Sequence, residues 1–248
     1  MPNEKKIYGL IGKNIDYSFS KKFFTEKFSK LNIENSCQYI NFDIDNLDDF
    51  ADLLNKPNIK GLNVTIPYKE SVLKYIDEID GEALKIGAVN TIKFDSKGKS
   101  IGFNTDYIGF KYSIQKFLKK YHKQALILGS GGASKAIVFA LDKLKIQRTI
   151  VSRTEKIGDI TYEKIDSQII KNHQIIVNCT PLGTSPNVNA CPDLPYNFLT
   201  EKHLCFDLIY NPKKTKFLKM SEKNKSKIVN GYEMLEVQAE ESWRIWNY

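Results

Sequence analysis

The stretch QALILGSGGASKAIVFALDKLKIQRTIVSRT, residues 124–154, decides the fold. Its first apolar run predicts a strand, a glycine-rich loop follows at 129–134, and Ile137, Leu141 and Leu144 then fall on one face of a helix. The run TIVS predicts a second strand and completes a βαβ unit. In this setting glycines let the backbone approach a pyrophosphate held at the helix N-terminus, although a tight turn without a ligand has the same pattern. The stretch therefore favours a dinucleotide site.

The end of the second strand indicates which dinucleotide binds. An NAD-binding unit carries an acidic side chain about 20 residues after the glycines, against the ribose 2′-hydroxyl. This chain has Ser152, Arg153 and Thr154 there instead. An arginine suits a 2′-phosphate, and Lys156 adds a second positive charge, so we expect NADP rather than NAD.

The rest of the chain extends the α/β pattern on both sides of this stretch. The first hundred residues alternate β-rich runs with helical patterns and end in a hairpin around the turn DSKG. Further strands are expected at 174–180, 204–210 and 227–230. In the last segment, Trp243 and Trp246 share an apolar helix face, which we expect to pack as core. At 1.5 Å per residue this helix is about 27 Å long, enough to return to the first half of the chain.

Composition excludes several classes of protein. The 248 residues, 42% of them apolar, fit a globular protein of one large or two small domains. No apolar run approaches the roughly 18 residues of a membrane span, and the N-terminus lacks a signal-peptide pattern, so we expect a soluble, cytoplasmic protein with no membrane partner. The net charge of +8 comes from dispersed lysines, with only three arginines, which favours a solvated surface over a nucleic-acid interface.

The four cysteines and three histidines are isolated along the sequence. This spacing favours reduced thiols in a reducing compartment and gives no support for a metal site or a histidine-based triad. We expect each histidine to lie on the surface or at the end of an element.

Two charged residues follow strand ends in the first half of the chain. Lys69 comes just after the strand in NVTIPYK, and Asp106 comes just after the one in GFNTDYIG. The carboxyl ends of strands are where α/β folds collect their ligands. Reduction of a ketone by hydride requires a proton, which a facing Lys69–Asp106 pair can manage. Taken singly, each residue also fits a solvated surface position.

Hydroxyl and amide side chains lie near other strand ends and fit a polyol ligand. Caps, turns and strand-end hydrogen bonds are their alternative roles, and Ser20 also fits as a cap of the helix that follows it. The set consists of Ser18, Ser20, Thr65, Asn90, Tyr210 and Gln238.

At this point the chain resembles the shikimate dehydrogenase family over nearly its full length. Nine segments occur in the family's order: YGLIGKNIDYSFS, NVTIPYK, GAVNT, GFNTDYIG, GSGGAS, SRT, NCTPLGT, DLIYNP and GYEMLEVQA. That family reduces 3-dehydroshikimate to shikimate with NADPH, on the route to chorismate and the aromatic amino acids. The resemblance implies an oxidoreductase with an α/β substrate domain at 1–104, completed by 232–248, and a Rossmann NADP domain at 105–231.

The resemblance also assigns roles to residues. Lys69 becomes the proton donor in reduction and Asp106 its partner, Ser18 and Ser20 hold the substrate carboxylate, and the other hydroxyl and amide residues contact the substrate. The implied phosphate-binding positions are Gly129, Ser130, Gly131, Gly132, Ala133, Ser152, Arg153, Thr154 and Lys156. The implied nicotinamide side consists of Thr180, Leu208, Gly231 and Met234.

The chain departs from the family pattern in three places. Lys13 and Tyr17 replace a proline and a histidine before the serine pair, and Ser152 replaces an asparagine. Asp159 comes only six residues after Arg153, whereas a parallel crossover takes a dozen or more. We therefore expect no helix between Thr154 and Thr161.

Other functions compete with this one. A quinate or dual-substrate dehydrogenase, with broader substrate or NAD use, is the nearest alternative. Methylene-tetrahydrofolate dehydrogenase shares the two-domain architecture but lacks this ordered motif set. A non-catalytic NADP-binding module or a nucleic-acid-binding protein are alternatives from other classes. We expect small-molecule partners only, in a monomer or homodimer.

Overall fold

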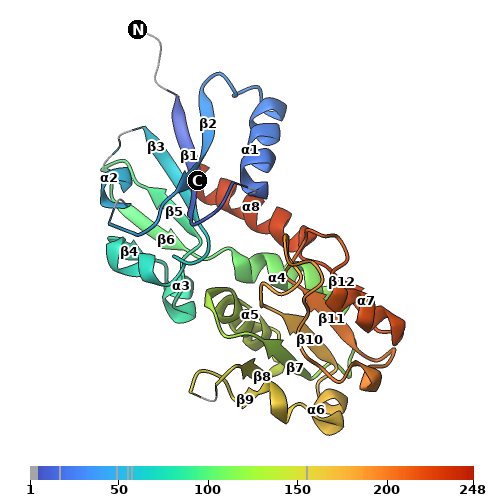
Figure 1. Cartoon of the computed structure of the whole chain (residues 1–248). Helices are drawn as coiled ribbons and strands as arrows, with labels where there is room; N and C mark the ends of the chain where they lie inside the picture. Colours follow the sequence, from blue (N-terminus) through green and yellow to red (C-terminus); the bar gives the residue numbers. More distant parts are fainter. Residues whose placement is uncertain (1–4, 17, 49, 55, 57, 155) are drawn as a thin grey trace. The chain divides into compact units, whose positions relative to one another are not determined.

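The computed structural model describes residues 5–248 except 17, 49, 55, 57 and 155. The chain divides into two compact units, Met1–Thr105 with Ala239–Tyr248 and Asp106–Gln238. Each unit has its own sheet, and each sheet has six strands. Figure 1 labels the strands. Within the part of the chain that the structure describes, no helix is both long and apolar enough to cross a membrane.

The sheet of the first unit is mixed. Its strands, in the order β2-β1-β3-β5-β6-β4, are Cys37–Asp43, Lys6–Gly12, Ile59–Val64, Thr91–Phe94, Ser100–Phe103 and Glu78–Ile79. β1 runs parallel to both β2 and β3, whereas β5 is antiparallel to β3 and forms a hairpin with β6. The hairpin is the one that the sequence predicts. β4, which joins the edge of the sheet parallel to β6, is not predicted.

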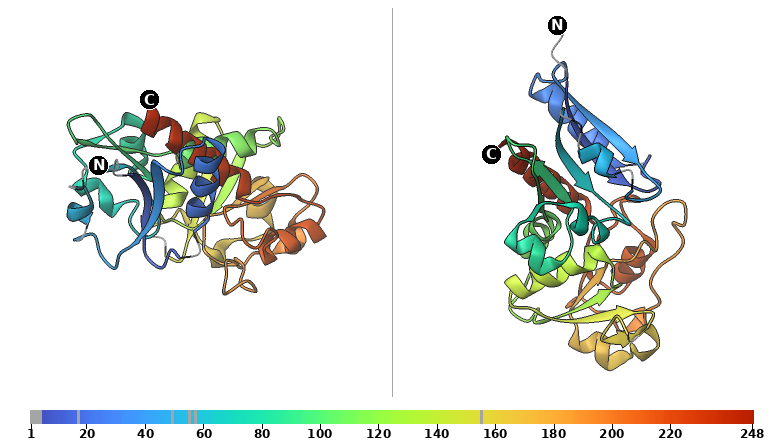
Figure 2. Two further views of the ribbon diagram at one scale, coloured as in Figure 1. Left: turned by 90° about the horizontal axis from the view of Figure 1, so that it is seen from above. Right: turned by 90° about the vertical axis from the view of Figure 1, so that its left-hand side faces the viewer.

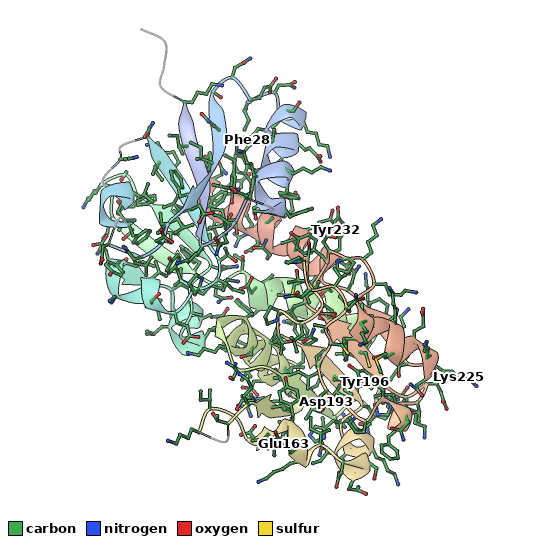
Figure 3. All side chains as sticks on the ribbon, viewed as in Figure 1. Phe28, Glu163, Asp193, Tyr196, Lys225 and Tyr232 are labelled. Carbon is green, nitrogen blue, oxygen red and sulfur yellow. The ribbon has the colours of Figure 1, made fainter. Side chains whose placement is uncertain are left out.

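Helices cover both faces of this sheet because strand side chains alternate between them. The helices are α1 (Phe19–Lys30), α2 (Phe50–Leu54), the 3₁₀ helix η1 (Ser71–Tyr75), α3 (Gly81–Ile86) and the C-terminal part of α8 (Tyr232–Asn247). Ile11, Leu62 and Val64 pack with α2, η1 and α3. Tyr8 and Leu10 pack on the other face with α1 and α8. Figure 2 shows α1 along β1 and β2. Phe28 of α1, labelled in Figure 3, packs in the cluster that α1 forms with these strands.

The end of α8 is fixed to this sheet by a tryptophan. Trp246 is buried, and its indole Nε1 donates a hydrogen bond to the carbonyl oxygen of Ile92 at 3.0 Å. A Cβ atom on Gly61 would lie 2.4 Å from the Trp246 ring, so only glycine fits beneath it. Trp243 packs against the same cluster. Trp246 is thus a core residue and the half-buried Trp243 packs against the core, in line with the sequence prediction.

The sheet of the second unit is entirely parallel. Its strands, in the order β12-β11-β10-β7-β8-β9, are Lys227–Val229, Leu204–Asp207, Ile175–Asn178, Gln124–Leu128, Gln147–Ser152 and Ile160–Thr161. β7 comes first along the chain, and successive strands add on either side of it. The order reverses between β7 and β10, and in such sheets ligands bind at this switch point.

Helices cover both faces of the parallel sheet as well. They are α4 (Asp106–Gln115), α5 (Gly132–Lys143), η2 (Tyr162–Lys164), α6 (Ser167–Asn172), η3 (Tyr196–Phe198) and α7 (Lys216–Lys223). Ala125 and Ile127 of β7 pack with α4 and α5. Leu126 and Leu128 point to the opposite face, toward α6, α7 and Tyr196, which is labelled in Figure 3. The observed architecture is the α/β fold that the sequence predicts.

The connection from β8 to β9 contains no helix among its described residues, as the short spacing predicts. A tight loop replaces it. The backbone N–H of Ile150 donates to the Asp159 carboxylate at 2.7 Å, and the N–H of Asp159 donates to the carbonyl oxygen of Ile150. Gly158 closes the loop, because a Cβ there would lie 2.9 Å from the Ser152 nitrogen.

The histidines lie at element ends, one of the two positions expected, but they are buried there. His122, His173 and His203 are 6%, 6% and 4% exposed. Their ring nitrogens bond backbone oxygens such as those of Lys202 and Ile170. Burial lowers the pKa of His122. A histidine with carbonyl partners in reach can be buried neutral, which spacing alone does not reveal.

Candidate active site

The glycine-rich loop lies between the carboxyl end of β7 and the start of α5. Gly129 has a φ of 103°, a left-handed conformation that favours glycine. Gly131 is the N-cap of α5, no side chain caps the helix there, and a Cβ on Gly131 would meet nothing within 4 Å. The exposed backbone donors of a helix N-terminus attract anions. Ser130, Gly132 and Ala133 are half-buried in the same turn.

The loops after neighbouring strands approach one another closely at two points. A Cβ on Gly129 would lie 3.1 Å from Cγ2 of Thr180, so the loops after β7 and β10 meet at the switch point. A Cβ on Gly231 would lie 2.0 Å from the carbonyl oxygen of Leu208, and the Gly231 N–H donates to Ile209. The structure thus brings together members of the predicted phosphate and nicotinamide sets. Met234 differs, because its side chain is 7% exposed and belongs to the core.

The loop after β8 carries the predicted 2′-phosphate residues. The Ser152 hydroxyl is buried in the loop, where it accepts from the Thr154 N–H and donates to the Thr154 carbonyl oxygen. Ser152 therefore shapes the turn. Arg153, Thr154 and Lys156 are exposed beside it. Because β8 is the parallel neighbour of β7, this loop and the glycine loop lie at the same edge of the sheet.

A buried carboxylate holds the loops after β10 and β11. Asp207 accepts hydrogen bonds from the Thr215 hydroxyl at 2.5 Å, the Asn178 amide at 3.0 Å and the Ile209 N–H at 3.1 Å. Asn178 in turn accepts from the hydroxyl of Thr180 at 2.6 Å and from its N–H at 3.0 Å. Burial raises the pKa of Asp207 to about 6. This hub is not among the residues predicted from the sequence, although the strand-end position of Asp207 was a usable signal.

These features of the second unit fit NADP. The exposed backbone of Gly131 leaves room for a pyrophosphate at the start of α5, as the open space at its Cβ position shows. The cationic side chains of Arg153 and Lys156 suit a 2′-phosphate. The loops at Thr180 and Leu208 follow two more strands of the same sheet edge. Among the described residues, no group of side chains could hold a metal ion.

The serine pair lies at the start of α1 in the first unit. Ser18 is the N-cap of this helix, and its Oγ accepts a hydrogen bond from the Ser20 N–H at 3.2 Å. The alternative role of Ser20 as the helix cap is therefore wrong. Ser20 is 8% exposed. Asp43 holds the preceding loop by accepting from the N–H groups of Asn14 and Ile15. Lys13 pairs with Asp45 at 3.0 Å, and Tyr17 lies outside the described residues.

Backbone hydrogen bonds bring Thr65, Lys69 and Asn90 together. The Val64 N–H donates to the Asn90 carbonyl oxygen at 2.9 Å, and the Val89 N–H donates to that of Lys69 at 2.7 Å. The turn that carries Thr65 and Lys69 is thus tied at both ends to the segment before β5. Thr65 and Lys69 are half-buried, and Asn90 is 2% exposed.

The side chain of Asn90 has a defined orientation. Its Oδ1 accepts from the Thr105 N–H at 2.7 Å and from the Thr91 hydroxyl at 3.1 Å, and its Nδ2 donates to the Thr105 hydroxyl at 3.0 Å. Thr105 directly precedes Asp106. Thr91 and Thr105 are also site-shaping residues that the sequence analysis missed, because a strand-end threonine is too common to stand out.

The remaining predicted substrate residues belong to the second unit. Asp106 is 5% exposed and opens α4. Gln238, on α8, is 9% exposed and packs against α4 at Gly109, where a Cβ would lie 3.2 Å from that of Gln238. Tyr210 is half-buried after β11. Because Lys69 belongs to the first unit, its pairing with Asp106 stays a prediction.

The chain is similar to known proteins over almost all of its length. Residues 10–92 match the family model described as the shikimate dehydrogenase substrate binding domain. The NADP(+)-dependent shikimate dehydrogenase of Clostridium botulinum is 40% identical over 247 residues, which cover 96% of this chain and 95% of that protein.

Solved structures are also similar to this chain over almost all of its length. A Thermus thermophilus shikimate 5-dehydrogenase in complex with NADP(H) and shikimate is 27% identical, with a TM-score of 0.86 over 97% of this chain and 93% of that one. A Corynebacterium glutamicum quinate dehydrogenase in complex with NAD is 25% identical, with a TM-score of 0.85 over 99% and 94%. The identity to the Clostridium protein, held over nearly the whole of both chains, shows that this chain belongs to the shikimate dehydrogenase family.

Proposed function

We propose that this chain catalyses the reversible, NADPH-dependent reduction of 3-dehydroshikimate to shikimate. The observation that carries the proposal is the 40% identity to an NADP(+)-dependent shikimate dehydrogenase over 96% of the chain. The second unit supports it with a glycine-lined helix N-terminus and a cationic loop at one sheet edge. We assign Met1–Thr105 with Ala239–Tyr248 to the substrate and Asp106–Gln238 to the cofactor.

In this mechanism NADPH supplies the hydride, and the protein supplies position and a proton. The Lys69 ammonium Nζ donates a proton to the oxygen that becomes the new hydroxyl, and the neutral amine that is left regains a proton from solvent. The Asp106 carboxylate, its partner, accepts a hydrogen bond from a substrate hydroxyl. Ser18 and Ser20 donate to the substrate carboxylate. The other substrate contacts are assigned to Thr65, Asn90, Tyr210 and Gln238.

We assign the cofactor contacts to the loops that follow the strands of the second unit. The glycine loop, Gly129 to Ala133, binds the pyrophosphate, and Arg153 and Lys156 bind the 2′-phosphate, with Ser152 and Thr154 forming the turn that presents them. Thr180, Leu208 and Gly231 face the nicotinamide, and Met234 supports them from the core. We further propose a cytoplasmic monomer or homodimer with no nucleic-acid partner, which fits the four free cysteines.

The test is an initial-rate assay in which shikimate or quinate is offered with NADP⁺ or NAD⁺. We expect turnover with shikimate and NADP⁺. The Lys69→Ala variant should lose about a thousandfold in kcat, the range of general acid–base catalysis, while its affinity for NADP⁺ stays unchanged. Lys85→Ala is the matched control, because Lys85 is an exposed lysine of the same unit.

Two results would contradict the proposal. If Lys69→Ala turned over as fast as Lys85→Ala, Lys69 would have no part in the chemistry. If the protein bound NADP⁺ but preferred quinate, the substrate assignment would be wrong while the fold and cofactor assignments stood.

A further inference from the structure

Ser242, on α8, lies at the centre of a buried polar network in the first unit. Its side chain is fully buried. Its Oγ lies 2.8 Å from Oγ1 of Thr91, 3.0 Å from Nδ2 of Asn63 and 3.4 Å from Oγ1 of Thr105. A residue of the last helix therefore contacts β3, β5 and the segment after β6 through hydrogen bonds. Serine at a buried helix position is unfavourable unless such partners exist.

The hydrogen bonds of this network can be followed from Tyr39 to Asn90, and each bond has a hydrogen of its own. The Tyr39 hydroxyl donates to Oδ1 of Asn63 at 2.8 Å, and Nδ2 of Asn63 donates to Oγ of Ser242. The Ser242 hydroxyl is then available to donate to Oγ1 of Thr91, and the Thr91 hydroxyl donates to Oδ1 of Asn90 at 3.1 Å. This relay of hydrogen bonds ends on Oδ1 of Asn90, the residue that we assign as a substrate contact.

The relay also begins beside an assigned substrate residue. Burial raises the pKa of Tyr39 well above its usual value, and a hydrogen bond with Ser20 acts in the opposite direction. Tyr39 is 4% exposed and Asn63 is 5% exposed, so neither reaches bulk solvent. The relay therefore joins Ser20 to Asn90 through buried side chains.

The orientation of Asn90 depends on this relay. An asparagine amide presents an acceptor on one side and donors on the other, so a turn of 180° about its last bond would exchange what it offers to a ligand. Two donors fix Oδ1 of Asn90, the Thr91 hydroxyl and the Thr105 N–H. Among the described residues of α8, only Ser242 has a hydroxyl within hydrogen-bond distance of both Thr91 and Thr105.

We propose that Ser242 is a positioning residue for substrate binding, which acts by holding Thr91 and Thr105 so that the Asn90 amide faces the substrate in one orientation. This inference rests on the proposed function, because it takes Asn90 as a substrate contact. Anchoring of α8 is not its role. Trp246, one turn further along, fixes the helix through Ile92 and Gly61 without Ser242.

The experiment compares Ser242→Ala with Ser113→Ala. Ser113 is also a fully buried helix serine, but its hydroxyl donates to a carbonyl of its own helix, that of Phe110. We expect Ser242→Ala to raise KM for shikimate about tenfold, as the loss of a buried hydrogen bond predicts, with KM for NADP⁺ within about twofold. Ser113→Ala should change neither KM, and the melting temperatures of both variants should fall by similar amounts.

A second pair of variants tests the relay itself. Thr91→Val keeps the shape of the side chain and removes the hydroxyl, so it should raise KM for shikimate as Ser242→Ala does, and the double variant should be no worse than either single variant. Thr91→Ser keeps the hydroxyl and should behave as the wild type. Additive effects, or equal rises in both KM values, would overturn the inference.

Calorimetric titration with shikimate separates this inference from the proposed function. A wild type that binds shikimate without turning it over would refute the proposed catalysis, and the Ser242→Ala comparison would then be made on the dissociation constant. A wild type that does not bind shikimate would overturn both. Equal affinity in wild type and Ser242→Ala would overturn the inference alone.

Discussion

The two units each bury a polar network at the ends of their strands, and the networks differ in charge. In the first unit, hydroxyls and amides alone connect Tyr39, Asn63, Thr91 and Ser242. In the second, a carboxylate, Asp207, lies at the centre. A neutral network needs only matched donors and acceptors, whereas a buried carboxylate also bears a desolvation cost. The groups of Thr215, Asn178 and Ile209 that donate to Asp207 are all neutral.

The difference shows how each network can serve its site. Hydroxyl groups can serve as donors or acceptors, so the first network can define a direction and fix one amide. A carboxylate only accepts when ionised, and Asp207 therefore draws donors from two loops, at Asn178 and Ile209, toward one point. The first network orients a side chain, and the second holds loop backbone.

The largest expected effect is a change with pH in the free energy of unfolding, caused by Asp207 in the second network. Burial raises the folded-state pKa of Asp207 from 3.8 to about 6, so the folded chain holds this proton more tightly than the unfolded chain. Its contribution to stability is fully present below pH 3.8 and is lost as the pH rises through 6. Relative to Asp207→Asn, the wild type should lose about 3 kcal/mol in free energy of unfolding between pH 3.8 and pH 7.

Urea unfolding of both proteins across this range measures the difference, in which the other titrating groups cancel. Ser242→Ala is the control from the neutral network, and its stability relative to wild type should not change with pH. Parallel curves for wild type and Asp207→Asn would mean that Asp207 stays ionised at no cost, and the contrast between the networks would fail.

A smaller effect concerns how the neutral network is held. Gly61→Ala should reduce the free energy of unfolding by about 2 kcal/mol, because the new methyl group would lie 2.4 Å from the Trp246 ring and displace it from Ile92. Gly81→Ala is the matched control, since nothing lies within 4 Å of its Cβ position. Equal urea midpoints for the two variants would show that α8 is not anchored at Gly61.

The smallest effect separates binding from stability in the second unit. Gly131→Ala should leave the free energy of unfolding within about 0.5 kcal/mol, because the Cβ position is open and φ is −83°. The methyl group should nevertheless weaken NADP⁺ binding about tenfold by keeping the pyrophosphate from the backbone. Fluorescence titration with NADP⁺ checks this, and an unchanged affinity would place the pyrophosphate elsewhere.

Elements were predicted correctly from the sequence where all the residues that specify them lie in one short segment. The glycine loop, the strand before it and the helix after it are neighbours along the chain, so residues 124–154 specify them locally. That the described residues between β8 and β9 form no helix follows from a count of residues in the same way. Prediction failed for β4 and did not reveal that the histidines are buried, because strand pairing and burial depend on distant partners.

The sequence by itself determined the α/β class, the parallel βαβ unit and the family, since period, glycine spacing and motif order are properties of the chain. Only the tertiary structure decided which polar groups meet. Thr91 and Ser242 are 151 residues apart, and their hydroxyls lie at 2.8 Å because α8 returns to the first sheet. The raised pKa of Asp207 likewise arises from burial between strands. Hydrogen bonding and desolvation depend on distance in space, which sequence order does not specify.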